Sequence, residues 1–246
     1  MTTFFTDIRH TLVPSRTGSE GPLPVLLVAM TLVTGLVDAF SYLVLGHVFV
    51  ANMTGNVVLL GFALAGAPGF SITASLAAIL SFVAGAVMGG QLGARFGAHR
   101  ARLLKTATLA QGAFLAVGVV LAGVGSLPLS AGWRYGLIVS LAVAMGIQNA
   151  TARKLAVADL TTTVLTLTIT GIAADSKVLG GKGSKAGRRL LAVAAMLLGA
   201  VVGAVLVLHS RVVVPLLVAL VVILGVAAVT GGLSNNNEEW TTAEHQ

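Results

Sequence analysis

Two short clusters of polar residues interrupt a chain that is otherwise strongly apolar. The first lies in Ala-Asn-Met-Thr-Gly-Asn at residues 51–56, and the second in Ala-Asp-Leu-Thr-Thr-Thr at residues 158–163. Each cluster heads an apolar run, one ending near Ala67 and the other near Ala174. An unsatisfied polar group in hydrocarbon costs several kcal/mol. Two such clusters in matching places therefore indicate a functional site.

The residues of both clusters suit the N-terminus of a helix. Asn52 or Thr54 suits the N-cap of a first helix, and Asp159 or Thr161 that of a second. A helix N-terminus also presents free N–H groups and partial positive charge, which suits an anion or a substrate carboxylate. Capping alone is the alternative interpretation. Three more residues in these first turns complete the candidate binding residues of the clusters: Gly55, Asn56 and Thr163.

A carboxylate lies inside the first long apolar run. Asp38 is about 12 Å from the outer end of this run by helical rise. An ionised carboxylate there costs at least about 2.5–3.5 kcal/mol, so Asp38 should face the protein interior and have a partner. We expect it to couple a proton or cation or to contact substrate; a buried carboxyl bonded to the neighbouring half-helix is the alternative.

Other polar residues extend the candidate site. Asn149 and its neighbour Gln148 occupy the position that corresponds to Asp38 in the second half of the chain. Asp159 belongs to the second cluster, but Arg153 and Lys154 are close in sequence. A salt bridge near the cytoplasmic surface is therefore a real alternative for Asp159.

The composition excludes several classes of protein. Of the 246 residues, 56% are hydrophobic and only 9% are charged, whereas soluble domains carry roughly 25% charged residues. The chain has no cysteine, which excludes thiol catalysis and cysteine metal sites. No two of its five histidines have metal-ligand spacing. We expect no metal, no other cofactor, no catalytic residue and no enzymatic activity.

Eight apolar segments can be marked along the chain, and the second and sixth are short once their polar heads are removed. They form one transmembrane domain over 22–231, between a disordered tail at 1–21 and a disordered acidic tail at 232–246. The segments are roughly 23–46, 50–67, 72–94, 103–124, 134–151, 155–174, 189–208 and 212–231.

The basic residues decide between topologies. If all eight segments cross the membrane, Lys and Arg divide eight against seven. If segments two and six enter and return, the side with the N-terminus holds thirteen and the other side holds only Arg134 and Arg211. If only the sixth returns, the division is eleven against four, with the N-terminus outside. The positive-inside rule favours thirteen against two, with both termini cytoplasmic. Basic residues in short loops between apolar runs also argue against a nucleic-acid partner.

The two halves of the chain resemble each other. Repeat 1 spans about 23–124 and repeat 2 about 134–231. With three spans each, the second repeat is inverted, which is a common plan of transporters and channels. We therefore predict an all-α polytopic membrane protein with six transmembrane helices and two re-entrant or broken half-helices. The matching segments are 35–39 with 146–150, 51–56 with 158–163, and 85–89 with 199–203.

Two glycine motifs predict close contacts between helices. Gly85 and Gly89, like Gly199 and Gly203, are four residues apart. We favour packing within one chain, and a homo-oligomer interface is the alternative.

Several of these segments resemble the YoaK family of bacterial membrane proteins. The resemblance covers about residues 25–230 and rests on Val37-Asp38-Ala39, on residues 49–56 with Leu60-Gly61, and on residues 144–150. The family is one of unknown function, so the resemblance implies a multi-pass protein of the bacterial inner membrane and no activity.

From the residues themselves we expect a secondary transporter or channel-like permease for a small solute or ion in the lipid bilayer. A non-transporting scaffold or regulatory protein is the first alternative. A membrane-embedded enzyme is the weaker one, because the apolar runs offer only Asp38 and Asp159 as ionisable groups.

Overall fold

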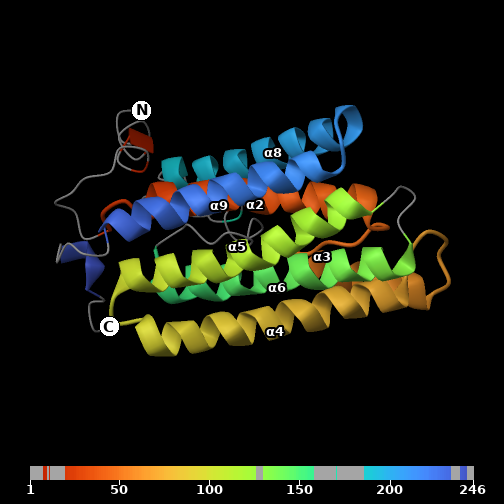
Figure 1. Cartoon of the computed structure of the whole chain (residues 1–246), viewed down its shortest axis with the longest axis horizontal. Coiled ribbons are helices and arrows are strands. Elements are labelled where there is room, and N and C mark those ends of the chain that lie inside the picture. Colours follow the sequence, from red (N-terminus) through yellow and green to blue (C-terminus); the bar gives the residue numbers. More distant parts are fainter. Residues whose placement is uncertain are drawn as a thin grey trace.

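A computed structural model shows a bundle of α-helices (Figure 1). The structure describes residues 8–9, 11, 20–125, 130–157, 170, 186–233 and 239–242. Six of the helices in these residues are long and apolar enough to cross a membrane, so the chain is a polytopic membrane protein. They are α2 (Leu23–Val44), α4 (Ile72–Phe96), α5 (Arg100–Val124), α6 (Ala131–Leu155), α8 (Ala186–His209) and α9 (Val213–Leu233).

A seventh helix, α3 (Met53–Leu64), has 12 residues. At 1.5 Å per residue it is about 18 Å long, which is less than the roughly 30 Å of a bilayer's hydrocarbon core. A short 3-10 helix, η2 (Glu239–Thr241), follows the bundle. Among the described residues there is no named β-strand, as the sequence predicts.

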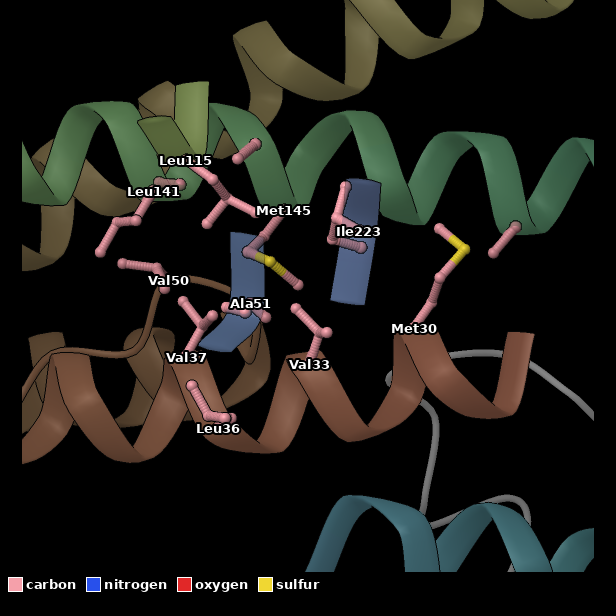
Figure 2. Packing of buried hydrophobic residues seen from close by; sticks show 14 of the residues in the cluster. Met30, Val33, Leu36, Val37, Val50, Ala51, Leu115, Leu141, Met145 and Ile223 are labelled. Atoms are coloured by element: carbon pink, nitrogen blue, oxygen red, sulfur yellow. The ribbon is translucent and has the colours of Figure 1, made fainter. Parts of the chain in front are cut away.

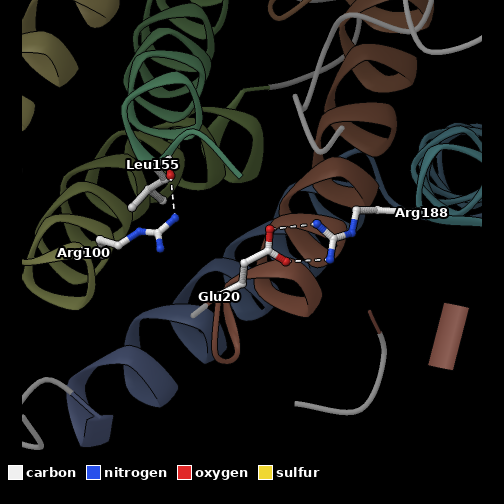
Figure 3. Close-up of polar contacts among 4 residues, drawn as sticks. All are labelled: Glu20, Arg100, Leu155 and Arg188. Carbon is white, nitrogen blue, oxygen red and sulfur yellow. Dashed lines mark hydrogen bonds and ion pairs between the residues drawn. The ribbon is translucent and has the colours of Figure 1, made fainter. Parts of the chain in front are cut away.

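One end of the bundle gathers basic residues. There Arg100 Nη2 donates a hydrogen bond of 2.7 Å to the Leu155 carbonyl at the end of α6, and Arg188 pairs with both carboxylate oxygens of Glu20 at 3.0 and 2.6 Å (Figure 3). The opposite end has Arg134 and Arg211. The start of α2 and the end of α9 both lie at the basic end (Figure 1). The six long helices alternate in direction between the two ends of the bundle (Figure 1).

The long helices pair between the two halves of the sequence. Helix α2 packs along α8, and helix α6 packs along α4. A side chain at Gly35 would meet the Met196 carbonyl, and one at Gly146 would meet the Phe82 carbonyl. Met196 and Phe82 each precede a predicted glycine motif by three residues. The two crossings therefore use equivalent positions, as two copies of one unit would.

The glycine motifs lie inside these crossings. A Cβ built on Gly85 would come within 2.2 Å of the Val143 carbonyl oxygen, and one on Gly199 within 2.0 Å of the Leu32 carbonyl oxygen. Gly89 and Gly203 face Ile147 and Leu36 one turn further on. Backbone therefore packs on backbone within one chain. The same glycine faces are not available for the homo-oligomer interface that was the alternative.

Apolar side chains cover the outside of the bundle as well as its core. Large residues such as Leu80, Val124, Leu208 and Val221 are exposed. A soluble protein rarely shows so large an apolar surface, whereas a protein in a bilayer must show one. These faces contact lipid.

The C-terminal segment differs from the sequence-based expectation of a disordered tail. Trp240 is fully buried and lies on Gly21, where a Cβ would be 2.4 Å from the indole ring. Thr242 forms an isolated β-bridge with His99 at the start of α5. The expectation is wrong for these residues because one indole buries enough apolar surface to hold a short segment against the bundle.

The glycine crossings lead to a stability prediction. Gly85→Ala should lower the unfolding midpoint in detergent, because its methyl group would collide with the Val143 backbone. Overpacking of this kind costs roughly 1–3 kcal/mol. The matched control is Gly90→Ala on the same helix, where no atom lies within 4 Å. Alanine there should be neutral or stabilise by up to about 1 kcal/mol.

Thermal unfolding of both variants checks this prediction. Gly199→Ala, at the equivalent crossing, should behave like Gly85→Ala. Equal midpoints for Gly85→Ala and Gly90→Ala would contradict the crossing.

Candidate functional site

The candidate site begins where the chain turns back at the end of α2. Gly46 has a φ of +89° and His47 a φ of +57°, so two successive residues are in the left-handed region. Glycine adopts this region at no steric cost, whereas histidine does so less readily. The chain then runs without regular structure to Asn52. Within this stretch Val48, Val50 and Ala51 are buried.

Aromatic rings hold the start of this segment. The Tyr42 ring stacks on Phe49 with centroids 4.9 Å apart and meets the edge of His47 at 5.1 Å. His47 Nδ1 lies 3.2 Å from the Gly69 carbonyl oxygen, and its ring lies 5.9 Å from Phe70. Residues before and after α3 therefore meet at the same end of the bundle.

The middle of the segment reaches the core. Val50 and Ala51 belong to one buried cluster with Val37 of α2 and Leu141 and Met145 of α6 (Figure 2). Their backbone N–H groups have no helix or strand to join, and a buried unpaired N–H costs about as much as a lost hydrogen bond. Something must accept these two hydrogen bonds.

Asp38 is that acceptor. Its Oδ1 receives hydrogen bonds from Val50 N at 3.0 Å and from Ala51 N at 2.8 Å. The residue is 5% exposed. Its second oxygen, Oδ2, is buried and has no hydrogen-bond partner among the described residues. One oxygen of Asp38 therefore fixes the segment before α3, and the other is a buried acceptor without a described partner.

Asn56, in the first turn of α3, holds the start of the same segment. Its Oδ1 accepts from Phe49 N at 2.9 Å, and its Nδ2 donates to the Phe49 carbonyl at 2.6 Å. Both backbone groups of one residue are thereby paired with one buried amide. This is a structural role, and it fixes the angle at which the chain enters α3.

The remaining residues of the first cluster either cap α3 or lie near its start. Asn52 is the N-cap of α3, and its Oδ1 accepts from Gly55 N at 3.1 Å. Thr54 is exposed. A Cβ on Gly55 would come within 2.8 Å of the Phe49 ring, so glycine allows the ring to pack there. Capping by Asn52 is confirmed, and Thr54 does not join the buried group.

The second cluster lies outside the described residues. Asp159, Thr161 and Thr163 were predicted to form the second half of the site. Their hydrogen bonds and surroundings stay predictions.

Gln148 takes part in a buried hydrogen-bond chain across three helices. Its Nε2 donates to Thr34 Oγ1 at 2.7 Å and to the Met30 carbonyl at 3.2 Å, both on α2. Its Oε1 accepts from Gln111 Nε2 of α5 at 2.7 Å. Gln111, Gln148 and Thr34 are all fully buried. Gln111 Oε1 has no partner among the described residues.

Gln111 was not predicted to belong to the site. It stands in an apolar run among small residues, Ala110 and Gly112, so nothing nearby marks it. Its partner Gln148 is 37 residues away. The signal in the sequence was that Gln111 and Gln148 lie in two different predicted spans. Amide side chains inside a membrane are stabilised by hydrogen bonds between helices, so two such residues suggest a pair.

Asn149 does not repeat the arrangement of Asp38. It is half-buried, and its Nδ2 donates to the Met145 carbonyl of its own helix at 3.0 Å. The two aligned positions therefore differ in the described contacts as well as in charge.

The described residues contain no group of three His, Cys, Asp or Glu side chains that would hold a metal. The polar groups of the site are the Asp38 carboxylate, which has one unpaired oxygen, and a hydrogen-bonded chain formed by Gln111, Gln148 and Thr34. Such groups bind and orient a ligand, and within the described residues no nucleophile–base pair accompanies them.

Comparison with known proteins gives the family. Residues 26–230 match the family described as "Protein of unknown function (DUF1275)". The chain is 36% identical over 152 residues to the UPF0700 transmembrane protein YoaK of Bacillus subtilis (strain 168), covering 61% of this chain and 65% of that protein. The chain thus matches less than two thirds of that relative's length. No solved structure matches. The protein belongs to the DUF1275 family of membrane proteins, as the resemblance to YoaK implied.

Proposed function

We propose that this protein is a secondary transporter or channel-like permease for a small solute or ion, and not an enzyme. One observation carries the proposal. The Asp38 carboxylate, inside an apolar helix, binds irregular backbone with one oxygen and leaves the other open. Ionisable groups inside spanning helices are rare and mark pathways for substrates, ions or protons.

The backbone at this depth supports a pathway. Irregular backbone is tolerated within a membrane only where it is buried in protein or lines a wet cavity. Residues 48–52 have no regular structure, and two of them bind Asp38, six residues before the end of α2. Six residues of helix rise about 9 Å. We infer that the segment from His47 to Gly69 is re-entrant.

The packing of helices from one half of the chain against helices from the other half supports an inverted repeat. Helix α2 packs against α8, which is the second-half counterpart of α4. Helix α6 packs against α4, which is the first-half counterpart of α8. In transporters of this plan the binding site lies near the midplane, beside discontinuous helices. Helix α3 begins just after the two residues that bind Asp38, about 9 Å inward from the end of α2.

We assign the basic end of the bundle to the cytoplasm and the protein to the bacterial inner membrane. The described helix ends there carry eight basic residues: Arg95, Arg100, Arg102, Lys105, Arg153, Lys154, Arg188 and Arg189. Cytoplasmic loops carry such an excess. Both termini are then cytoplasmic.

A second candidate function is a non-transporting membrane scaffold. The observation that favours it is that Asn52 and Asn56 are both satisfied by nearby backbone. A scaffold would need every buried polar group to be paired in this way. Asp38 Oδ2 and Gln111 Oε1 are buried acceptors without a described partner, and they favour the permease.

Replacing the carboxylate tests the proposal. Asp38→Asn keeps an oxygen that accepts from Val50 N and Ala51 N, so the variant should fold. It loses the charge, and a hydrogen bond to a charged group contributes about 1.5–3 kcal/mol. Uptake into proteoliposomes should fall by about tenfold or more. A panel of labelled cations, anions and small metabolites first identifies a transported species for this measurement.

Thr31→Val is the matched control. It removes a buried hydroxyl of the same helix that binds only its own helix, at the Leu27 carbonyl. Its uptake should equal that of the unmodified protein. Unchanged uptake by Asp38→Asn would remove Asp38 from the mechanism.

Cysteine labelling tests the topology, because the chain has no native cysteine. Ala65, just after α3, and Ser210, between α8 and α9, are exposed at one end of the bundle, and Ala98 is exposed at the other. An impermeant maleimide should label Ala65→Cys and Ser210→Cys in intact cells. Ala98→Cys should be labelled only after permeabilisation. Labelling of Ala65→Cys only after permeabilisation would mean that α3 crosses.

A further inference from the structure

We propose that the site at Asp38 binds a small monovalent cation and that Gln111 contributes to its binding. This inference rests on the proposed function and names the chemical class of its ligand. It is argued from two facts: which hydrogen-bonding groups near α3 are already paired, and which remain open.

The donors at the entry to α3 are already paired. Val50 N and Ala51 N donate to Asp38, Phe49 N donates to Asn56, and Gly55 N donates to Asn52. A helix N-terminus attracts an anion through such N–H groups. Here the Asp38 carboxylate is the anion that they bind. The anion ligand considered from the sequence therefore has no donors left among these four.

The open atoms on α2 and α5 are acceptors, whereas the unpaired Nε of Arg134, whose side chain lies near Gly46, is a donor at the end of the bundle. Asp38 Oδ2 and Gln111 Oε1 are both buried without a described partner. The orientation of the glutamines follows from chemistry. The Met30 carbonyl can only accept, so Gln148 must turn its Nε2 toward it and its Oε1 toward Gln111. Gln111 must then donate to that oxygen through Nε2, which leaves its own Oε1 open.

The two open acceptors belong to one polar column. Asp38 and Thr34 are four residues apart on α2, so they lie on the same face about 6 Å apart along the axis. Thr34 accepts from Gln148, and Gln148 accepts from Gln111. Helices α2, α5 and α6 thus supply a hydrogen-bonded chain of two amides and a hydroxyl that begins one helical turn from Asp38 and ends at the unpaired Gln111 Oε1.

The charge of this column suits a cation. Asp38 is its only ionisable member, and the described Lys and Arg residues lie toward the helix ends, as at Lys105 and Arg134. Carboxylate and carbonyl oxygens are the ligands that hard cations prefer. A bound cation also neutralises a carboxylate that is costly to keep in an apolar span. An anion would be repelled by the unpaired Asp38 carboxylate oxygen.

Cation-dependent stabilisation of the purified full chain tests this inference without requiring transport. A ligand that binds only the folded state raises its stability with the logarithm of ligand concentration. We expect at least one of sodium, potassium and ammonium chloride to raise the unfolding midpoint in a saturable way. Choline chloride, nitrate and sulfate at matched ionic strength should not do so.

Variants assign the effect to the column, with each shift measured from the variant's own ligand-free midpoint. Asp38→Asn and Gln111→Leu should each raise the half-saturating cation concentration, by about tenfold or more for Asp38→Asn. Gln111→Glu, which adds a second carboxylate, should lower it. A residue that merely packs would not respond to charge in this way. Thr31→Val is the control and should keep the original value.

The outcomes separate the two proposals. Stabilisation by the cation that is lost in Asp38→Asn, without uptake in proteoliposomes, would uphold the cation site and reject the permease. No cation shift, a shift with choline salts only, or an equal shift in Asp38→Asn would overturn the cation site. A labelled anion taken up independently of Asp38 would overturn it as well.

Discussion

The structure depends on one buried contact between a carboxylate and two backbone N–H groups. Asp38 Oδ1 accepts from Val50 N and Ala51 N at a level where lipid or apolar side chains offer no other acceptor. Without it, the segment before α3 would carry two unsatisfied donors into the core, each costing on the order of 1–3 kcal/mol. The carboxylate in turn gains partners that partly offset its burial. Each feature makes the other possible, and α3 starts where it does because of both.

The close packing of the long helices gives this contact a rigid frame. Gly35 and Gly146 let α2 approach α8 and α6 approach α4 at backbone distance, through the same set of positions in each half. Helices held in this way bring Val37 of α2, the residue before Asp38, into one buried cluster with Leu141 and Met145 of α6. The polar column from Asp38 to Gln111 crosses the interface between α2, α5 and α6. Asp38 Oδ2 and Gln111 Oε1 are buried acceptors without a partner among the described residues, and the proposed function rests on them.

Much of this was predictable from sequence because membranes impose simple rules. The length of each apolar run and the distribution of Lys and Arg predicted six spans and a short segment at residues 50–67. The repeat predicted that Gly35 corresponds to Gly146, and the packing agrees. Asp38 was predicted to face inward with a partner because an ionised carboxylate cannot face lipid cheaply. Its partners are two backbone N–H groups of the segment before α3.

Other features depended on contacts that the local sequence does not show. Gln111 meets Gln148 only because α5 packs on α6. Asn56 suggested a ligand contact, but its amide binds Phe49, seven residues earlier. Trp240 stands among polar and acidic residues, and its burial against Gly21 follows from the shape of the basic end of the bundle. An experimental structure in a lipid nanodisc would test the central contact most directly. We expect Asp38 to accept hydrogen bonds from Val50 N and Ala51 N, and the chain to enter and leave α3 on one side of the bilayer. An Asp38 that faces lipid, or an α3 that continues across the bilayer, would contradict it.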